Sequence, residues 1–272
     1  MRENKNNDLI GELNDVFKET VHFHQILKTA PNLVDEGDYD AEASLAGEAQ
    51  EIKTELNTDD KHAILLPPSN FFTSPITFRY KKLPFSQVIA LRQRGVKPGL
   101  LTANIVAIDL SKKVIILHQR SPESHVYPNV LSIPGGGFWP SDGSVHGDGE
   151  NIVNTARREF YEETKQAAKI NDDTAIVVTE EIQTGAVQVN FLGAITKIEE
   201  NKDTNWEGSV EFIHFDQLYN ALVTREWAPL GKGCVLLWLA LGAPGVKNTK
   251  FDGLTPQGLY QKYIGKNISL GD

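Results

Sequence analysis

Arg158-Glu159-Phe160-Tyr161-Glu162-Glu163 is the stretch of this chain that says most about its fold and chemistry. In a helix, Glu159 precedes Glu162 by three residues and Glu163 by four, so all three carboxylates lean to one face. Like charges gathered in this way need a cation, and carboxylate oxygens suit Mg²⁺ or Mn²⁺. An isolated pair such as Glu162-Glu163 is more often a solvated helix face. The surrounding sequence has to decide between these two interpretations.

Two upstream features favour a metal site. Ile133-Pro134-Gly135-Gly136-Gly137 comes before the acidic stretch, and seven residues separate Glu150 from Arg158. Together they resemble the Nudix box, which reads Gly, five residues, Glu, seven residues, Arg-Glu, an aliphatic or aromatic residue, any residue, Glu-Glu, any residue, Gly and an apolar residue. The matching positions are Glu150, Arg158, Glu159, Phe160, Glu162 and Glu163.

The chain departs from this pattern at two places. Twelve residues, 138–149, separate Gly137 from Glu150 where the family has five, which indicates an insertion of about seven residues in the loop before the helix. Lys165 stands where the family has the Gly that ends the helix in a left-handed conformation. We therefore expect the helix to continue through Ala168.

The resemblance covers roughly residues 98–245 and implies an α/β fold, a Nudix-like α/β/α sandwich with a mixed sheet. A mainly helical, acidic N-terminal extension over 1–97 would precede this domain, and a tail over 246–272 would follow it. Apolar spacing predicts helices over 8–29, 45–56, 85–94, 151–168, 216–224 and 233–241, and strands over 62–66, 76–80, 101–109, 113–119, 175–179, 186–195 and 209–215.

Charge and composition limit the partners of the protein. Residues 1–60 hold 15 acidic and 5 basic side chains, a net charge of −10, so the remaining residues carry +1 of the total of −9. No cluster of Lys and Arg with interleaved aromatic residues marks a nucleic-acid groove, so we expect a small nucleotide substrate and no nucleic-acid polymer.

The sequence also predicts a cytoplasmic protein that does not bind a membrane. The single Cys234 excludes an intramolecular disulfide, and a reducing compartment is then the default. The first residues are polar, unlike a signal peptide, and the longest apolar run, 234–241, is too short to cross a bilayer. The apolar stripe from Leu9 to Leu27 needs a partner surface, either on its own domain or across a homodimer.

The resemblance implies a Mg²⁺- or Mn²⁺-dependent hydrolase, with Glu159, Glu162 and Glu163 as metal ligands. Arg158 would orient the carboxylates by ion pairing, with Glu150 as its partner, and Glu159, Arg158 and Glu150 are then the candidate catalytic residues. A purely structural ion pair of Arg158 with Glu150 is an equally good interpretation. The general base varies within the family, and the sequence leaves five candidates: Glu180, Glu181, Glu199, Glu207 and Glu211.

Four residues are candidates for substrate binding. Gly136 and Gly137 would lie close to the pyrophosphate, and a backbone carbonyl near Gly136 often joins the metal shell in this family. Trp139 could stack on a base or a sugar, or it could simply pack in its loop. Arg120 could contact a phosphate, or it could be an exposed Arg at the end of a strand.

Two functions remain open. The first is a pyrophosphohydrolase that cleaves a nucleoside diphosphate linked to another moiety, with ADP-ribose or another nucleoside diphosphate-sugar as the best candidate. The second is a non-catalytic Nudix module that binds a nucleotide or a protein, with the inserted loop blocking or reshaping the site. The three glutamates favour the enzyme.

Overall fold

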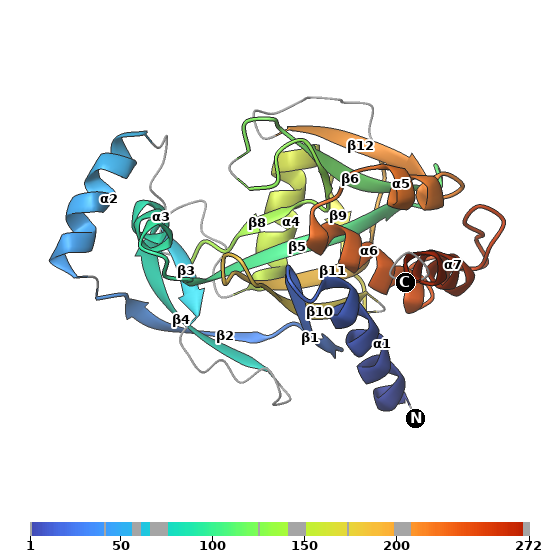
Figure 1. The fold of residues 1–272 in the computed structure, drawn as a ribbon, viewed down its shortest axis with the longest axis horizontal. Helices are drawn as coiled ribbons and strands as arrows, with labels where there is room; N and C mark the ends of the chain where they lie inside the picture. Colours follow the sequence, from blue (N-terminus) through green and yellow to red (C-terminus); the bar gives the residue numbers. More distant parts are fainter. Residues whose placement is uncertain are drawn as a thin grey trace.

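Strand β5 (Gly99–Asp109) is the centre of one mixed sheet (Figure 1). The structure is a computed structural model that describes residues 2–40, 42–55, 61–65, 76–124, 126–140, 151–172, 174–198 and 208–268. One edge of β5 pairs in parallel with β11 (Val187–Thr196). The other edge pairs antiparallel with three strands in turn, β3 (Lys61–Leu65), β8 (Gly135–Gly137) and β6 (Val114–Arg120).

The remaining strands extend the sheet on both sides of β5. Beyond β11 come β10 (Ala175–Glu181) and β1 (Val21–Leu27), and beyond β3 come β4 (Thr77–Pro84) and β2 (Asn32–Asp38). β6 also pairs with β7 (Leu131–Ser132) and β12 (Gly208–His214), and β11 pairs with β9 (Ala168–Lys169).

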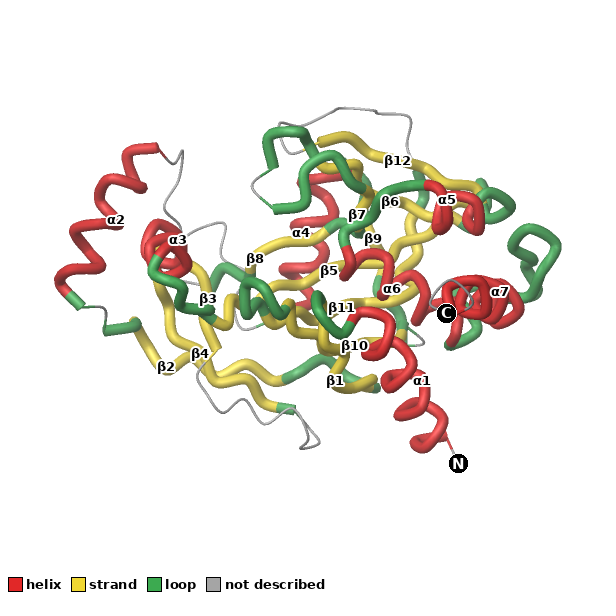
Figure 2. Tube along the Cα trace, viewed as in Figure 1, coloured by secondary structure: helices red, strands yellow, loops and turns green. Residues whose placement is uncertain are grey.

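Helices cover both faces of this sheet, as the tube in Figure 2 shows. Alternate residues of β5 point to opposite faces. Leu101, Ala103 and Ile105 join the core beneath α4 (Ile152–Thr164), whereas Val106 and Ile108 join the core on the opposite face. That second core is closed by α1 (Arg2–Phe17), α5 (Leu218–Thr224), α6 (Pro229–Ala240) and α7 (Pro256–Ile268). The expected α/β architecture with a mixed sheet between helices is confirmed.

The first 97 residues are less helical than the sequence predicted. They supply four strands, β1 to β4, besides α1, α2 (Ala43–Glu55) and α3 (Phe85–Gln93). β1 pairs with β10 and β3 pairs with β5, so strands of this region belong to the same sheet as residues 98–245. The division of the chain at residue 97 stays a prediction.

The predicted helix over 8–29 is wrong in its second half. α1 ends at Phe17, and Val21 to Leu27 form β1, in which Val21 and Phe23 are buried. Apolar residues two apart fit a strand, and β10 offers these residues an edge to pair with. The apolar side of α1 is covered within the chain, because Leu13 and Phe17 lie in the core together with residues of α6.

The other predicted elements are present, with ends shifted by a few residues. α6 begins at Pro229, four residues earlier than expected, because Pro at a first helical position has a backbone suited to that place. Among the described residues, no helix is long and apolar enough to cross a membrane.

We predict that Phe23→Ala destabilises the protein by about 3–5 kcal/mol, since it removes a fully buried ring from the core between β1 and α6. Val16→Ala is the matched control on α1, because Val16 is 41% exposed; its effect should stay within about 0.5 kcal/mol. Urea denaturation measures the free energy of unfolding of both variants. Equal effects of the two substitutions would show that β1 is not part of the cooperative fold.

Candidate active site

Helix α4 carries the acidic stretch on a partly buried face. Asn151 caps the helix, since its side-chain oxygen accepts a hydrogen bond from Val153 N at 2.9 Å. Ala156, Glu159, Phe160 and Glu163 are all buried and follow the spacing of one helix face. Two carboxylates therefore occupy positions where a helix that covers a sheet ordinarily has apolar side chains.

Helix α4 ends earlier than the sequence predicted. Lys165 adopts a left-handed conformation (φ 55°, ψ 23°) and its N–H donates to Tyr161 O at 2.8 Å, so the expected continuation through Ala168 is wrong. Ala168 instead begins β9, which pairs with β11. Tertiary pairing thus imposes on Lys165 the conformation that Gly would adopt at lower cost.

The glycine strand β8 lies between β5 and α4, and a side chain would be obstructed at each of its positions. A Cβ at Gly136 would come within 2.7 Å of Glu159 Oε1. A Cβ at Gly137 would overlap with the His62 ring, and one at Gly135 would overlap with Asn104. The glycines therefore allow the backbone of β8 to touch the acidic face of α4.

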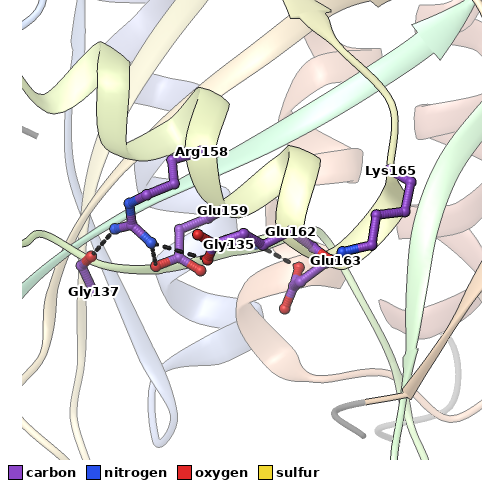
Figure 3. A network of polar contacts seen from close by, with 7 residues as sticks. All are labelled: Gly135, Gly137, Arg158, Glu159, Glu162, Glu163 and Lys165. Atoms are coloured by element: carbon purple, nitrogen blue, oxygen red, sulfur yellow. Dashed lines mark hydrogen bonds and ion pairs between the residues drawn. The ribbon is translucent and has the colours of Figure 1, made fainter. Parts of the chain in front are cut away.

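Arg158 connects the carboxylates to this strand (Figure 3). Its Nη1 donates to Glu159 Oε1 at 2.8 Å and to Glu162 Oε2 at 3.1 Å, and its Nη2 donates to Gly137 O at 2.8 Å. The guanidinium also lies over the ring of Trp139, 3.9 Å from the ring centroid. In this structure Arg158 therefore supplies the positive charge that the sequence analysis assigned to a metal ion.

Glu163 has a separate set of partners. Its Oε2 accepts a hydrogen bond from Gly135 N at 2.9 Å, and its Oε1 lies 3.2 Å from Nδ1 of His118 on β6. His118 was not among the site residues predicted from the sequence. A signal was present, because His118 is the first polar residue after the apolar run 114–117.

Glu159 is electrostatically strained. Burial raises its pKa to about 8; the positive charge of Arg158 opposes this shift, and the negative charges of Glu163 and Glu162 add to it. A carboxylate with a pKa in this range remains short of compensating positive charge despite its contact with Arg158. An additional cation near Glu159 would relieve this shortage.

The donors suit the expected metal in kind. Carboxylate oxygens of Glu159, Glu162 and Glu163 and backbone oxygens of β8 are hard ligands, which Mg²⁺ and Mn²⁺ prefer. Within the part of the chain that the structure describes, however, no three His, Cys, Asp or Glu side chains are arranged to hold a metal ion. Glu159 and Glu162 are turned to Arg158, and Glu163 is turned to Gly135 and His118.

Three further residues were predicted to belong to the site: Glu150, Arg120 and Trp139. Glu150, the expected partner of Arg158, lies outside the described residues. Arg120 uses its Nε to donate to Val126 O at 3.0 Å, so this nitrogen supports the loop after β6. One face of Trp139 is covered by Arg158, which favours the packing interpretation of this residue over stacking on a base.

The candidates for the general base lie at different faces of the sheet. Glu199 and Glu207 are outside the described residues. Glu211 alternates along β12 with Val210 and Phe212, which pack on the α4 side, and so it points to the opposite face. Residues 178 and 180 of β10 point to the same face of the sheet, so Glu180 lies on the α4 side together with Val178. The Oε2 atom of Glu180 lies 3.2 Å from Nε2 of His24.

We predict that Glu159→Gln stabilises the metal-free protein increasingly between pH 4.5 and about pH 8. Folded Glu159, with its pKa raised from 4.5 to about 8, holds a proton that the unfolded chain releases, so the wild-type protein loses stability as pH rises through this window. The greatest slope of the free energy of unfolding is about 1.4 kcal/mol per pH unit. Urea denaturation at several pH values measures the free energy of unfolding of the wild type and of Glu159→Gln. If the two free energies changed in parallel with pH, the raised pKa of Glu159 would be contradicted.

We predict that Gly136→Ala weakens Mn²⁺ binding by roughly 10-fold or more, because the new methyl group displaces the Glu159 carboxylate. Gly47→Ala on α2 is the control, since a Cβ there meets no atom within 4 Å. Isothermal titration calorimetry with Mn²⁺ measures both variants. Unchanged affinity in Gly136→Ala would remove Glu159 from the metal site.

Comparison with known proteins gives a partial likeness of fold. No significant match was found among protein-family models or among curated proteins. Similar solved structures include a NUDIX hydrolase from Nitrosomonas europaea, with 17% identity and a TM-score of 0.37 over 50% of this chain and 85% of that chain. A Nudix hydrolase from M. Smegmatis has 13% identity and a TM-score of 0.39 over 56% of this chain and 91% of that chain.

A third similar structure is a bifunctional NMN adenylyltransferase/ADP ribose pyrophosphatase from Francisella tularensis, crystallised with AMP and a manganese ion. The identity is 14% and the TM-score 0.41, over 57% of this chain and 46% of that chain. This chain thus spans less than half of that protein.

Proposed function

We propose that this protein is a divalent-metal-dependent pyrophosphohydrolase that cleaves a nucleoside diphosphate linked to another moiety. The observation that carries the proposal is the contact of α4 with β8, where Arg158 joins Glu159 and Glu162 to the backbone of Gly137. Three glutamates within two helical turns, next to the half-buried glycine strand β8, support this proposal.

The proposed reaction is the attack of a water molecule on a phosphoanhydride bond. A bound Mg²⁺ or Mn²⁺ would neutralise phosphate oxygens and lower the pKa of a water molecule. Glu159, Glu162 and Glu163 are the side chains that would hold it, with a backbone carbonyl of β8 near Gly136. Arg158 orients two of these carboxylates through one guanidinium, which keeps their oxygens on the β8 side of the helix.

The proposed substrate is small and elongated, with ADP-ribose or another nucleoside diphosphate-sugar as the first candidate. Residues 61–272 carry a net charge of only +1, which does not suit a nucleic-acid polymer. The N-terminal region reaches the site, because His62 of β3 faces Gly137 and its ring centroid lies 6.2 Å from that of Trp139. This region can therefore contribute to the walls around a substrate that extends beyond the pyrophosphate.

One observation favours the second candidate, a module that binds a nucleotide or a protein without hydrolysis. Arg158 already forms ion pairs with Glu159 and Glu162, and no described group of side chains is arranged to hold a metal ion. A phosphate bound next to Arg158 would need no metal. Measured turnover separates this alternative from the enzyme.

We predict hydrolysis of at least one member of a panel of ADP-ribose, UDP-glucose, dinucleotide polyphosphates and nucleoside triphosphates, with Mg²⁺ or Mn²⁺ required. Glu162→Gln and Glu163→Gln should each lower kcat by roughly 10²-fold or more, because each removes a charge while keeping the side-chain volume. Product release is measured by ion-exchange chromatography, and circular dichroism checks the fold.

The control for this panel is Tyr260→Phe, which removes a hydroxyl that donates to Glu12 Oε2 at 2.7 Å on the opposite face of the sheet. Its kcat should equal that of the wild type. A double variant, Glu162→Gln with Glu163→Gln, that kept wild-type turnover would reject the metal assignment. A wild-type protein that binds a panel nucleotide but hydrolyses none would support the binding module.

A further inference from the structure

We propose that His118 is a positioning residue for Glu163 and sets the affinity of the site for its divalent cation. The inference rests on the proposed function, since it assigns to His118 the task of orienting one of the proposed metal ligands. His118 lies on β6 and is 1% exposed, so it is positioned to act through Glu163 rather than on a substrate.

The two oxygens of Glu163 are fixed from two different strands. Gly135 N of β8 donates to Oε2 at 2.9 Å, and His118 Nδ1 of β6 lies 3.2 Å from Oε1. An ionised carboxylate oxygen can accept more than one hydrogen bond or ligand. Both oxygens of Glu163 therefore keep a lone pair for a cation while the plane of the carboxylate is held.

The ring of His118 has little freedom to move away from Glu163. A Cβ at Gly208, the first residue of β12, would come within 2.6 Å of His118 Nε2, so the backbone of β12 lies directly against this side of the ring. Nε2 has no hydrogen-bond partner among the described residues. The tautomer with its proton on Nδ1 suits these surroundings, because it directs the N–H to the carboxylate and leaves the bare nitrogen toward Gly208.

Glu163 depends on His118 more than the other two glutamates do. Arg158 holds Glu159 and Glu162, whereas the partners described for Glu163 are Gly135 and His118. Gly135 contributes a backbone N–H, which no substitution at that position removes except proline. The side chain at 118 is therefore the place at which this chain can tune the orientation of Glu163.

The test measures Mn²⁺ binding to the metal-free full-length protein by electron paramagnetic resonance, so that turnover is not needed. His118→Leu removes the donor and should raise the Kd for Mn²⁺ by roughly 10- to 100-fold. His118→Asn keeps an N–H donor close to the place of Nδ1 and should restore the Kd to within about 3-fold of wild type. His118→Gln moves the donor by one bond and should give an intermediate Kd.

Tyr260→Phe is the structural control, because it removes one partly buried hydrogen bond on the other face of the sheet and should lower Tm without changing the Kd. Recovery of the Mn²⁺ affinity in His118→Asn is a result that a purely structural role of His118 would not produce. If a panel substrate is hydrolysed, His118→Leu should raise the metal concentration at half-maximal rate while the rate at saturating metal recovers.

The outcomes separate this inference from the proposed function. Wild-type Mn²⁺ binding with an unchanged Kd in His118→Leu would overturn the role of His118 and leave the proposed function standing. If His118→Leu does not fold, an unchanged Kd in His118→Gln decides against the role in the same way. A wild-type protein that binds no Mn²⁺ would overturn both.

Discussion

The close approach of β8 to α4 is the constraint on which the rest of the site depends. It exists because residues 135–137 lack side chains, so that Gly136 can lie against the Glu159 carboxylate and Gly137 against His62. Pairing of β8 with β5 fixes the strand from the other side. Arg158 and Glu163 can then reach backbone atoms of Gly137 and Gly135, which joins the acidic helix to the sheet through polar contacts.

Charge balance decides how the side chains of the site are arranged. Two buried glutamates and one more exposed neighbour cannot all be ionised at low cost in a partly dehydrated place. Arg158 forms ion pairs with Glu159 and Glu162. Glu163 instead contacts the backbone N–H of Gly135 and Nδ1 of His118. Burial still holds the pKa of Glu159 near 8, so the compensation by Arg158 is incomplete. Incomplete compensation is the physical basis for proposing that a divalent cation binds here.

The N-terminal region is bound to the sheet at both of its outer sides. β1 extends the sheet beyond β10, with Phe23 in the same core as α6, and β3 pairs with the first residues of β5. Because β3 also carries His62 to Gly137, this region borders the proposed site. Strand pairing over such long separations in sequence cannot be recognised from helical or strand periodicity, which reports only on neighbouring residues.

The sequence by itself determined most helices and longer strands of residues 98–245 and the acidic face of α4, because spacing within one helix or strand is a local property. It could not separate α1 from β1, since apolar residues near Phe23 fit either period, and it could not foresee that pairing of β9 with β11 ends α4 at Lys165. Only the tertiary structure decided that Arg158 is the cation facing Glu159 and that His118 lies against Glu163. These contacts join separate elements, and their geometry is set by how β6, β8 and α4 pack together.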